Sequence, residues 1–98
     1  MLKAKMNNFS CWVEETDSDT LMDYFGKMLV DSGFNVLDIA VHYFRPQGFT
    51  ALFLLSESHF AIHTFPERNK TYLELTSCVE VPYYNFVQNM NLQRTRED

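Results

Sequence analysis

The hydrophobic pattern of this chain changes from a helical period to a period of two close to residue 34, and that change limits the folds open to it. Between Leu21 and Leu29 the apolar side chains recur at helical spacing, which puts them on one face of a helix. The run Asp17-Ser18-Asp19 offers capping oxygens ahead of them, and Gly33 suits the left-handed residue that ends a helix. From Asn35 onward the alternation has a period of two, which is typical of strands. The sequence therefore predicts one amphipathic helix followed by a sheet.

Strand signals on both sides of this helix extend the prediction to an α+β fold. We expect a single domain over residues 1–98, a two-layer sandwich in which an antiparallel sheet carries the helices on one face. A hairpin centred on Arg68 would place Ser58 opposite Cys78 and His63 opposite Leu73. The expected elements are a strand at 8–14, the helix between Asp17 and Gly33, strands at 35–44, 49–55, 60–65 and 71–78, and a short helix that starts at Pro82.

The strand expected at 49–55 is apolar on both of its faces, as a central strand covered on both sides would be. A chain of 98 residues with one helical layer leaves the second face of its sheet open. The simplest cover is a second copy of the chain, so we expect a homodimer. On the strand expected at 35–44, one face combines the polar side chains of Asp38 and His42 with the aromatic ring of Phe44. Such a mixed face is typical of the wall of a site.

Charge and glycine content exclude several classes of function. Lys and Arg number 8 against 13 Asp and Glu, a net charge of −5 with no basic run, so nucleic acids and anionic membranes are poor partners. The three glycines lie too far apart to form a phosphate-binding loop. The longest uninterrupted apolar run, Ala51 to Leu55, is too short to span a membrane, and no signal-like segment begins the chain. We therefore expect a cytoplasmic protein.

The histidines and cysteines do not form a metal-binding pattern. His59 and His63 would share a face of an extended strand, but their Cα atoms would lie about 13 Å apart, too far for one ion. We expect no metal, with one of these histidines hydrogen-bonded and the other exposed. Cys11 and Cys78 lack the Cys-x-x-Cys spacing. A thiol nucleophile at Cys78 with a histidine base is an alternative, although a lone cysteine is more often a packing residue.

Three segments in the second half of the chain carry a resemblance to a known family. They are His42-Tyr43-Phe44-Arg45-Pro46-Gln47-Gly48, Leu55-Ser56-Glu57-Ser58-His59-Phe60-Ala61-Ile62-His63-Thr64-Phe65-Pro66-Glu67 and Thr76-Ser77-Cys78. Their order and spacing closely resemble those of the prokaryotic S-adenosylmethionine decarboxylase proenzymes, which are pyruvoyl enzymes of polyamine synthesis. The resemblance runs from Val41 to Cys78 without a gap, and upstream only the order of elements is similar.

The resemblance implies that the chain cuts itself between Glu57 and Ser58. In the family the serine hydroxyl attacks the preceding carbonyl to give an ester, β-elimination follows, and hydrolysis of the dehydroalanine leaves a pyruvoyl group. The products here would be residues 1–57 and a pyruvoyl-headed chain over 58–98. The position matching His63 assists processing by proton transfer. The one matching Cys78 donates a proton during decarboxylation and also influences processing. The pyruvoyl ketone forms a Schiff base with the substrate amine and delocalises the charge left by carbon dioxide.

The resemblance also implies how the substrate is recognised. Phe44 and Phe65 match the aromatic residues that sandwich the adenine ring, and Glu67 matches the carboxylate that binds the ribose hydroxyls. The implied function is decarboxylation of S-adenosylmethionine, which supplies aminopropyl groups for spermidine synthesis. Without the flanking motifs, the same two phenylalanines would be predicted to lie in the core of the sheet.

Departures from a simple match leave alternatives open. Ser58 and His63 would lie about 16 Å apart on opposite faces of a straight strand. The resemblance, in which the two matching positions cooperate, implies instead that the chain bends near His59. The Gly-x-His element of the family is absent from the first strand, Phe65 stands where Trp is frequent, and the segment after Glu67 differs. The alternatives are a pyruvoyl-dependent decarboxylase of ornithine or arginine, and a relative that binds or regulates without cutting itself.

Overall fold

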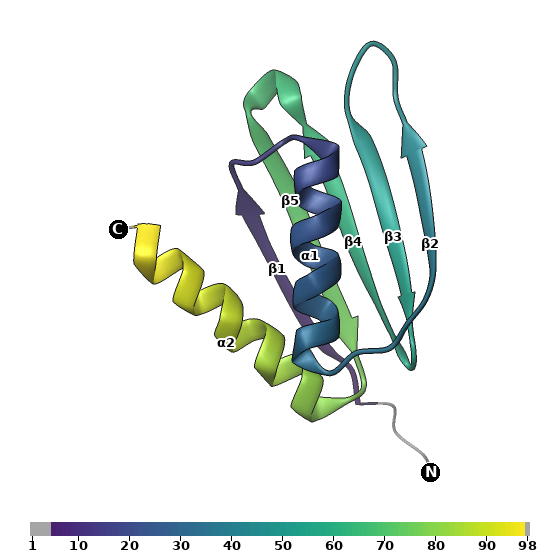
Figure 1. Ribbon diagram of the computed structural model, residues 1–98, viewed down its shortest axis with the longest axis vertical. Helices are drawn as coiled ribbons and strands as arrows, with labels where there is room; N and C mark the ends of the chain where they lie inside the picture. The colour runs from purple at the N-terminus through teal and green to yellow at the C-terminus, as the bar shows by residue number, and fades with distance from the viewer. Residues whose placement is uncertain (1–4, 98) are drawn as a thin grey trace.

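The computed structural model describes residues 5–97, and within that range the chain forms one sheet and two helices. The strands of the sheet pair antiparallel in the order β1-β5-β4-β3-β2. Figure 1 shows the two helices, α1 and α2, in front of the sheet. The predicted two-layer α+β sandwich is confirmed. Its elements are β1 (Asn7–Val13), α1 (Ser18–Ser32), β2 (Val36–Tyr43), β3 (Phe49–Leu55), β4 (Ser58–Phe65), the 3-10 turn η1 (Pro66–Arg68), β5 (Lys70–Ser77) and α2 (Glu80–Glu97).

Helix α1 is capped at both ends by the residues that the sequence indicates. The Asp17 carboxylate accepts a hydrogen bond from the Thr20 N–H at 2.9 Å, which satisfies a donor that has no partner within the helix. Gly33 is left-handed, with a φ of 112°, and its N–H donates to the carbonyl of Val30 at 3.0 Å. The apolar stripe is buried except at Tyr24, which lies at its edge and is 42% exposed.

The core lies between the helices and one face of the sheet, with Phe60 of β4 at its centre. The ring centroid of Phe60 lies 5.7 Å from that of Phe25 in α1, 5.8 Å from Phe53 in β3 and 5.4 Å from Phe86 in α2. None of Phe53, Phe60 and Phe86 is more than 1% exposed. Because one ring contacts both helices, α1 and α2 pack on the same face of β4.

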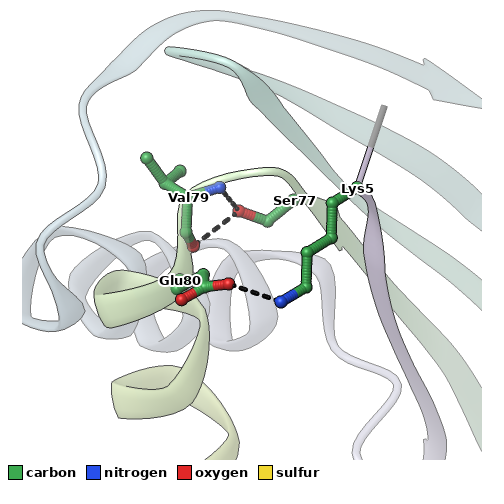
Figure 2. A network of polar contacts seen from close by, with 4 residues as sticks. All are labelled: Lys5, Ser77, Val79 and Glu80. Atoms are coloured by element: carbon green, nitrogen blue, oxygen red, sulfur yellow. Dashed lines mark hydrogen bonds and ion pairs between the residues drawn. The ribbon is translucent and has the colours of Figure 1, made fainter. Parts of the chain in front are cut away.

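Helix α2 differs from the prediction of a short helix starting at Pro82. It begins at Glu80 and runs over 18 residues. Proline is tolerated anywhere in a first helical turn, because the N–H it lacks has no helical partner there, so Pro82 marks that turn and not its first residue. Figure 2 shows the Glu80 carboxylate beside the Lys5 ammonium, 2.8 Å away. This hydrogen-bonded ion pair raises the pKa of Lys5 and lowers the pKa of Glu80.

The hairpin of β4 and β5 is shifted by one residue from its predicted register. The turn explains the shift, because η1 is followed by Asn69 in the left-handed conformation, with a φ of 53°. The connection between paired strand ends therefore spans residues 66–69, an even number, whereas a turn centred on Arg68 needs an odd one. The two predicted pairs are wrong: Ser58 faces Ser77 in place of Cys78, and His63 faces Tyr72 in place of Leu73.

The face of the sheet turned away from the helices is uncovered in a single chain. In β3, Phe53 and Leu55 point toward the helices and are buried, whereas Leu52 and Leu54 point away and are 48% and 54% exposed. Strand β3 is thus covered on one side only in this chain. We call this surface the open face, and the homodimer that would cover it stays a prediction. Its large apolar side chains include Trp12, Leu52, Leu54 and Phe65.

Candidate functional site

The connection between β3 and β4 holds the bond that the sequence motif singles out. Leu55 pairs with Ser58, so only Ser56 and Glu57 make the turn. Glu57 has a φ of 61°, a conformation that glycine and asparagine adopt readily and that costs other residues about 1 to 2 kcal/mol. The peptide bond from Glu57 to Ser58 therefore follows directly on a strained residue.

The carbonyl oxygen of Glu57 has hydrogen-bond donors on several sides. The Ser58 hydroxyl donates at 2.7 Å, the Cys78 thiol at 2.9 Å and the Cys78 N–H at 3.4 Å. Donors that converge on a carbonyl oxygen stabilise the negative charge that develops there when a nucleophile attacks the carbon. The nucleophile is also at hand, because the Ser58 oxygen already contacts this carbonyl group. The arrangement is suited to attack of Ser58 on the carbonyl that precedes it.

The Ser58 hydroxyl has a second contact, with a residue for which the sequence predicted no role. Ser77 lies opposite on β5, and the two Oγ atoms are 2.7 Å apart. Ser77 Oγ accepts a hydrogen bond from the Val79 N–H at 3.0 Å and donates to the Val79 carbonyl at 3.1 Å (Figure 2). Both serines are buried, Ser77 completely. We call Glu57, Ser58, Ser77 and Cys78 the loop cluster. The one-residue register error hid this pair, since Cys78 was expected in the place of Ser77.

His63 lies away from the loop cluster. Strand β4 pairs with both neighbours from Ser58 to His63 without a bulge, so the predicted bend near His59 is wrong. The straight strand holds His63 on the open face, about 16 Å along from Ser58. Its Nδ1 lies 2.9 Å from the hydroxyl of Thr50, a contact that the β3–β4 pairing creates. His59 is exposed, so the expectation of one hydrogen-bonded and one exposed histidine is confirmed.

The three residues expected to bind the substrate lie at the opposite end of the sheet. Phe44 follows β2 and is 51% exposed, while Phe65 ends β4 and is 37% exposed, so the alternative that these rings are core residues is wrong. The ring centroid of Phe65 is 5.8 Å from that of Trp12. Glu67 follows in η1 with an exposed side chain. We call Phe44, Phe65 and Glu67 the aromatic end. Seven residues of strand, about 23 Å, separate Phe65 from Ser58.

Metal ligands do not gather in the part of the chain that the structure describes. Across residues 5–97, no three or more His, Cys, Asp or Glu side chains come together in a way that could hold an ion. Over the same residues, no helix has the length and apolar character needed to cross a membrane. Cys11 lies in the core and Cys78 is exposed at the loop cluster.

Comparison with known proteins gives one consistent family. A family model described as S-adenosylmethionine decarboxylase matches residues 8–93. The S-adenosylmethionine decarboxylase proenzyme of Geobacillus kaustophilus is 35% identical over 71 residues, which cover 68% of this chain and 57% of that protein. The proenzyme 2 of Bacillus cereus is 47% identical over 47 residues, or 48% of this chain and 38% of that protein.

A solved structure is similar in fold. The adenosylmethionine decarboxylase of Aquifex aeolicus aligns with a TM-score of 0.70 at 18% identity, over 89% of this chain and 78% of that one. This chain spans only part of the first curated relatives, since the matched segment covers 57% of their length.

Proposed function

The chain belongs to the S-adenosylmethionine decarboxylase family, and from this premise we propose that it cuts itself between Glu57 and Ser58 and then decarboxylates S-adenosylmethionine. The relatives that it matches are named proenzymes. The observation that carries the proposal is the Glu57 carbonyl, which has the Ser58 hydroxyl at 2.7 Å and the Cys78 thiol at 2.9 Å. Self-cleavage needs a nucleophile and an oxyanion donor at one peptide bond, and here that bond follows a residue in a strained conformation.

The cut begins with an exchange of bonds at the Glu57 carbonyl carbon. The Ser58 oxygen bonds to this carbon, the bond from the carbon to the Ser58 nitrogen breaks, and the hydroxyl proton ends on the freed amine. The Cys78 thiol and N–H stabilise the oxyanion between these events. A base then takes the Cα proton of residue 58, and the main-chain carboxylate of Glu57 leaves from Cβ, which gives a dehydroalanine. Water hydrolyses this dehydroalanine to the pyruvoyl group and releases its nitrogen as ammonia. We assign the base to His63.

The product of the cut is a pyruvoyl group at position 58, and the residues around it fit its use. When formed, this group supplies a ketone that draws off the electron pair left when carbon dioxide departs. Cys78 stays beside position 58 with an exposed thiol, where it can deliver a proton to the substrate carbon.

The aromatic end supports S-adenosylmethionine as the substrate. Phe44 and Phe65 offer exposed ring faces for a purine, and the exposed Glu67 carboxylate can accept hydrogen bonds from both ribose hydroxyls. Ornithine and arginine have neither a base nor a ribose, so they would leave these three side chains without a role. The decarboxylated product would donate aminopropyl groups to spermidine synthesis.

A second copy of the chain is the partner that this function requires. One chain holds its loop cluster about 23 Å from its aromatic end and places His63 on the other face of the sheet. In a two-fold symmetric pair, the loop cluster of one copy can meet His63 and the aromatic end of the other. Glu57 and Cys78 are exposed to such an approach, and Leu52 and Leu54 offer apolar surface for the contact.

Mass spectrometry of the purified chain tests the first half of the proposal. Two species, residues 1–57 and a hydrazine-reactive chain over 58–98, are expected from the wild type. The Ser58→Ala variant should stay whole, because it lacks the nucleophile. A wild-type chain that remains intact and inert to hydrazine after long incubation would contradict self-cleavage and favour a relative that only binds.

Release of labelled carbon dioxide tests the second half. Carboxyl-labelled S-adenosylmethionine, ornithine and arginine are compared side by side with the cut protein. Only S-adenosylmethionine should release label, and Cys78→Ala should cut at least slowly yet release little. Release from an amino acid alone would refute the assignment of the aromatic end.

A further inference from the structure

We propose that Ser77 is a positioning residue for self-cleavage, which holds the Ser58 hydroxyl so that its lone pairs face the Glu57 carbonyl carbon. This inference rests on the proposed function and assigns a role to a residue to which the resemblance gives none. Ser77 is 0% exposed and its Oγ lies 2.7 Å from that of Ser58. The contact follows from the register of β4 against β5, which seats the two serines opposite each other.

The surroundings of Ser77 make its hydroxyl an acceptor toward Ser58. Its one proton is directed to the Val79 carbonyl at 3.1 Å, and it accepts from the Val79 N–H at 3.0 Å (Figure 2). A hydroxyl has one proton and two lone pairs, so the remaining lone pair of Ser77 is free for the Ser58 proton. Val79 itself directly precedes α2, and the Lys5–Glu80 ion pair links the first residue of that helix to the segment ahead of β1.

Ser58 therefore has two acceptors within 2.7 Å, the Glu57 carbonyl and Ser77, but a single proton to share between them. While the proton points to the carbonyl oxygen, the lone pairs of the Ser58 hydroxyl are turned away from the carbonyl carbon. When the proton turns to Ser77, the lone pairs of Ser58 are freed toward the carbonyl, whose oxygen keeps the Cys78 thiol as a donor. Ser77 gains and loses no proton overall, because the Ser58 proton ends on the amine released by the cut.

Three variants separate this role from a general effect on folding. Ser77→Ala removes the acceptor, and Ser77→Thr restores a hydroxyl at the same position. Thr64→Val is the matched control, because Thr64 is a buried hydroxyl on the same strand as Ser58 that also accepts a backbone N–H, from Phe49 at 2.7 Å, and donates to the carbonyl of that residue at 3.2 Å. Both hydroxyl deletions lose similar backbone bonds, but only one of them contacts Ser58.

The measurement is the rate at which freshly refolded precursor is converted to fragments, followed by mass spectrometry. Ser77→Ala should cut about 100-fold more slowly than the wild type, the scale of loss that misplacement of a reacting group causes. Ser77→Thr should cut within about tenfold of the wild type, and Thr64→Val within about twofold. Thermal unfolding of each precursor in a Ser58→Ala background compares their stability.

Hydroxylamine gives a readout that a purely structural role would not move. It cleaves an ester, so a variant that forms the ester and then stalls, as expected of His63→Ala, should be cut by it. Ser77→Ala should accumulate no ester for hydroxylamine to cut, because formation of the ester is its slow step. The inference is overturned if Ser77→Ala matches Thr64→Val in rate, or if hydroxylamine cuts Ser77→Ala as it does His63→Ala. Wild-type chain that never cuts overturns the proposed function itself, whereas a normal rate in Ser77→Ala leaves self-cleavage standing.

Discussion

Two variants that cannot cut themselves should restore cutting when they are paired. The first is Ser58→Ala, which has no nucleophile but keeps His63. The second is His63→Ala, which keeps Ser58 but lacks the base. Unbroken pairing of β4 holds Ser58 and His63 on opposite faces and about 16 Å apart. Under the proposed function, the histidine that acts within hydrogen-bond reach of Ser58, about 3 Å, therefore comes from another copy.

The statistics of random pairing fix the fraction of His63→Ala chains that should be cut. If the two variants are co-expressed in equal amounts and pair at random, half of the His63→Ala chains sit beside a chain that carries His63, so about half of them should be cut. With a threefold excess of the Ser58→Ala chain the cut fraction should rise to about three quarters. If each chain used its own histidine, the cut fraction would stay near zero at every ratio.

Distinct tags on the two chains allow a denaturing gel to report which one is cut. The control partner carries both substitutions, Ser58→Ala and His63→Ala, and should rescue nothing. Absence of any cut His63→Ala chain, when a tag pull-down proves that mixed pairs have formed, would refute the inference that the base comes from a second copy. Efficient cutting of His63→Ala alone would refute the role of the histidine as base.

Further predictions concern stability, strain and binding. Hydrogen bonds from the N–H and the hydroxyl of Thr20 hold the pKa of the Asp17 carboxyl below its usual range. The charged Asp17 cap therefore stabilises the fold fully above its unfolded pKa, about 4, and this stabilisation is lost as the pH falls through the lower folded pKa. The melting temperature of wild type should therefore exceed that of Asp17→Ala by about 5 °C at pH 7, and the difference should shrink as the pH falls below about 4; an advantage unchanged by pH would contradict this. Glu57→Asn suits the left-handed φ of 61°, so an uncleavable precursor carrying it should melt a few degrees higher, about 2 to 5 °C, and an unchanged or lower midpoint would argue against strain. Trp12 is the one tryptophan and lies 5.8 Å from Phe65, so its emission should change when S-adenosylmethionine binds the cut protein and stay constant with methionine.

Local rules were enough to predict much of the fold from the sequence. The helix between Asp17 and Gly33 has a polar cap, an apolar stripe and a glycine end, and each of these acts within one or two turns. The strands follow from the period of two. The register of β4 against β5 depends on the backbone of one residue, Asn69, whose left-handed conformation no periodicity reveals.

The candidate site was predictable where it depends on a motif and not where it depends on pairing. Ser58 and Cys78 were assigned through the resemblance, and the structure brings both into contact with the Glu57 carbonyl. Ser77 was missed because a register error of one residue exchanges neighbours across strands. The bend expected near His59 was implied by the resemblance, in which the positions matching Ser58 and His63 cooperate, and the unbroken pairing of β4 contradicts it.

The bond proposed to break joins two strands that are neighbours in the interior of the sheet. A nick there would leave β1, α1, β2 and β3 on one fragment and β4, β5 and α2 on the other. The strands of the two fragments are interleaved in the sheet, since β5 lies between β1 and β4. The Phe60 ring would also keep its contacts with Phe25 and Phe53 of the other fragment. The two fragments of the nicked molecule should consequently stay associated and elute together in size-exclusion chromatography, and they should separate only when the whole fold is denatured.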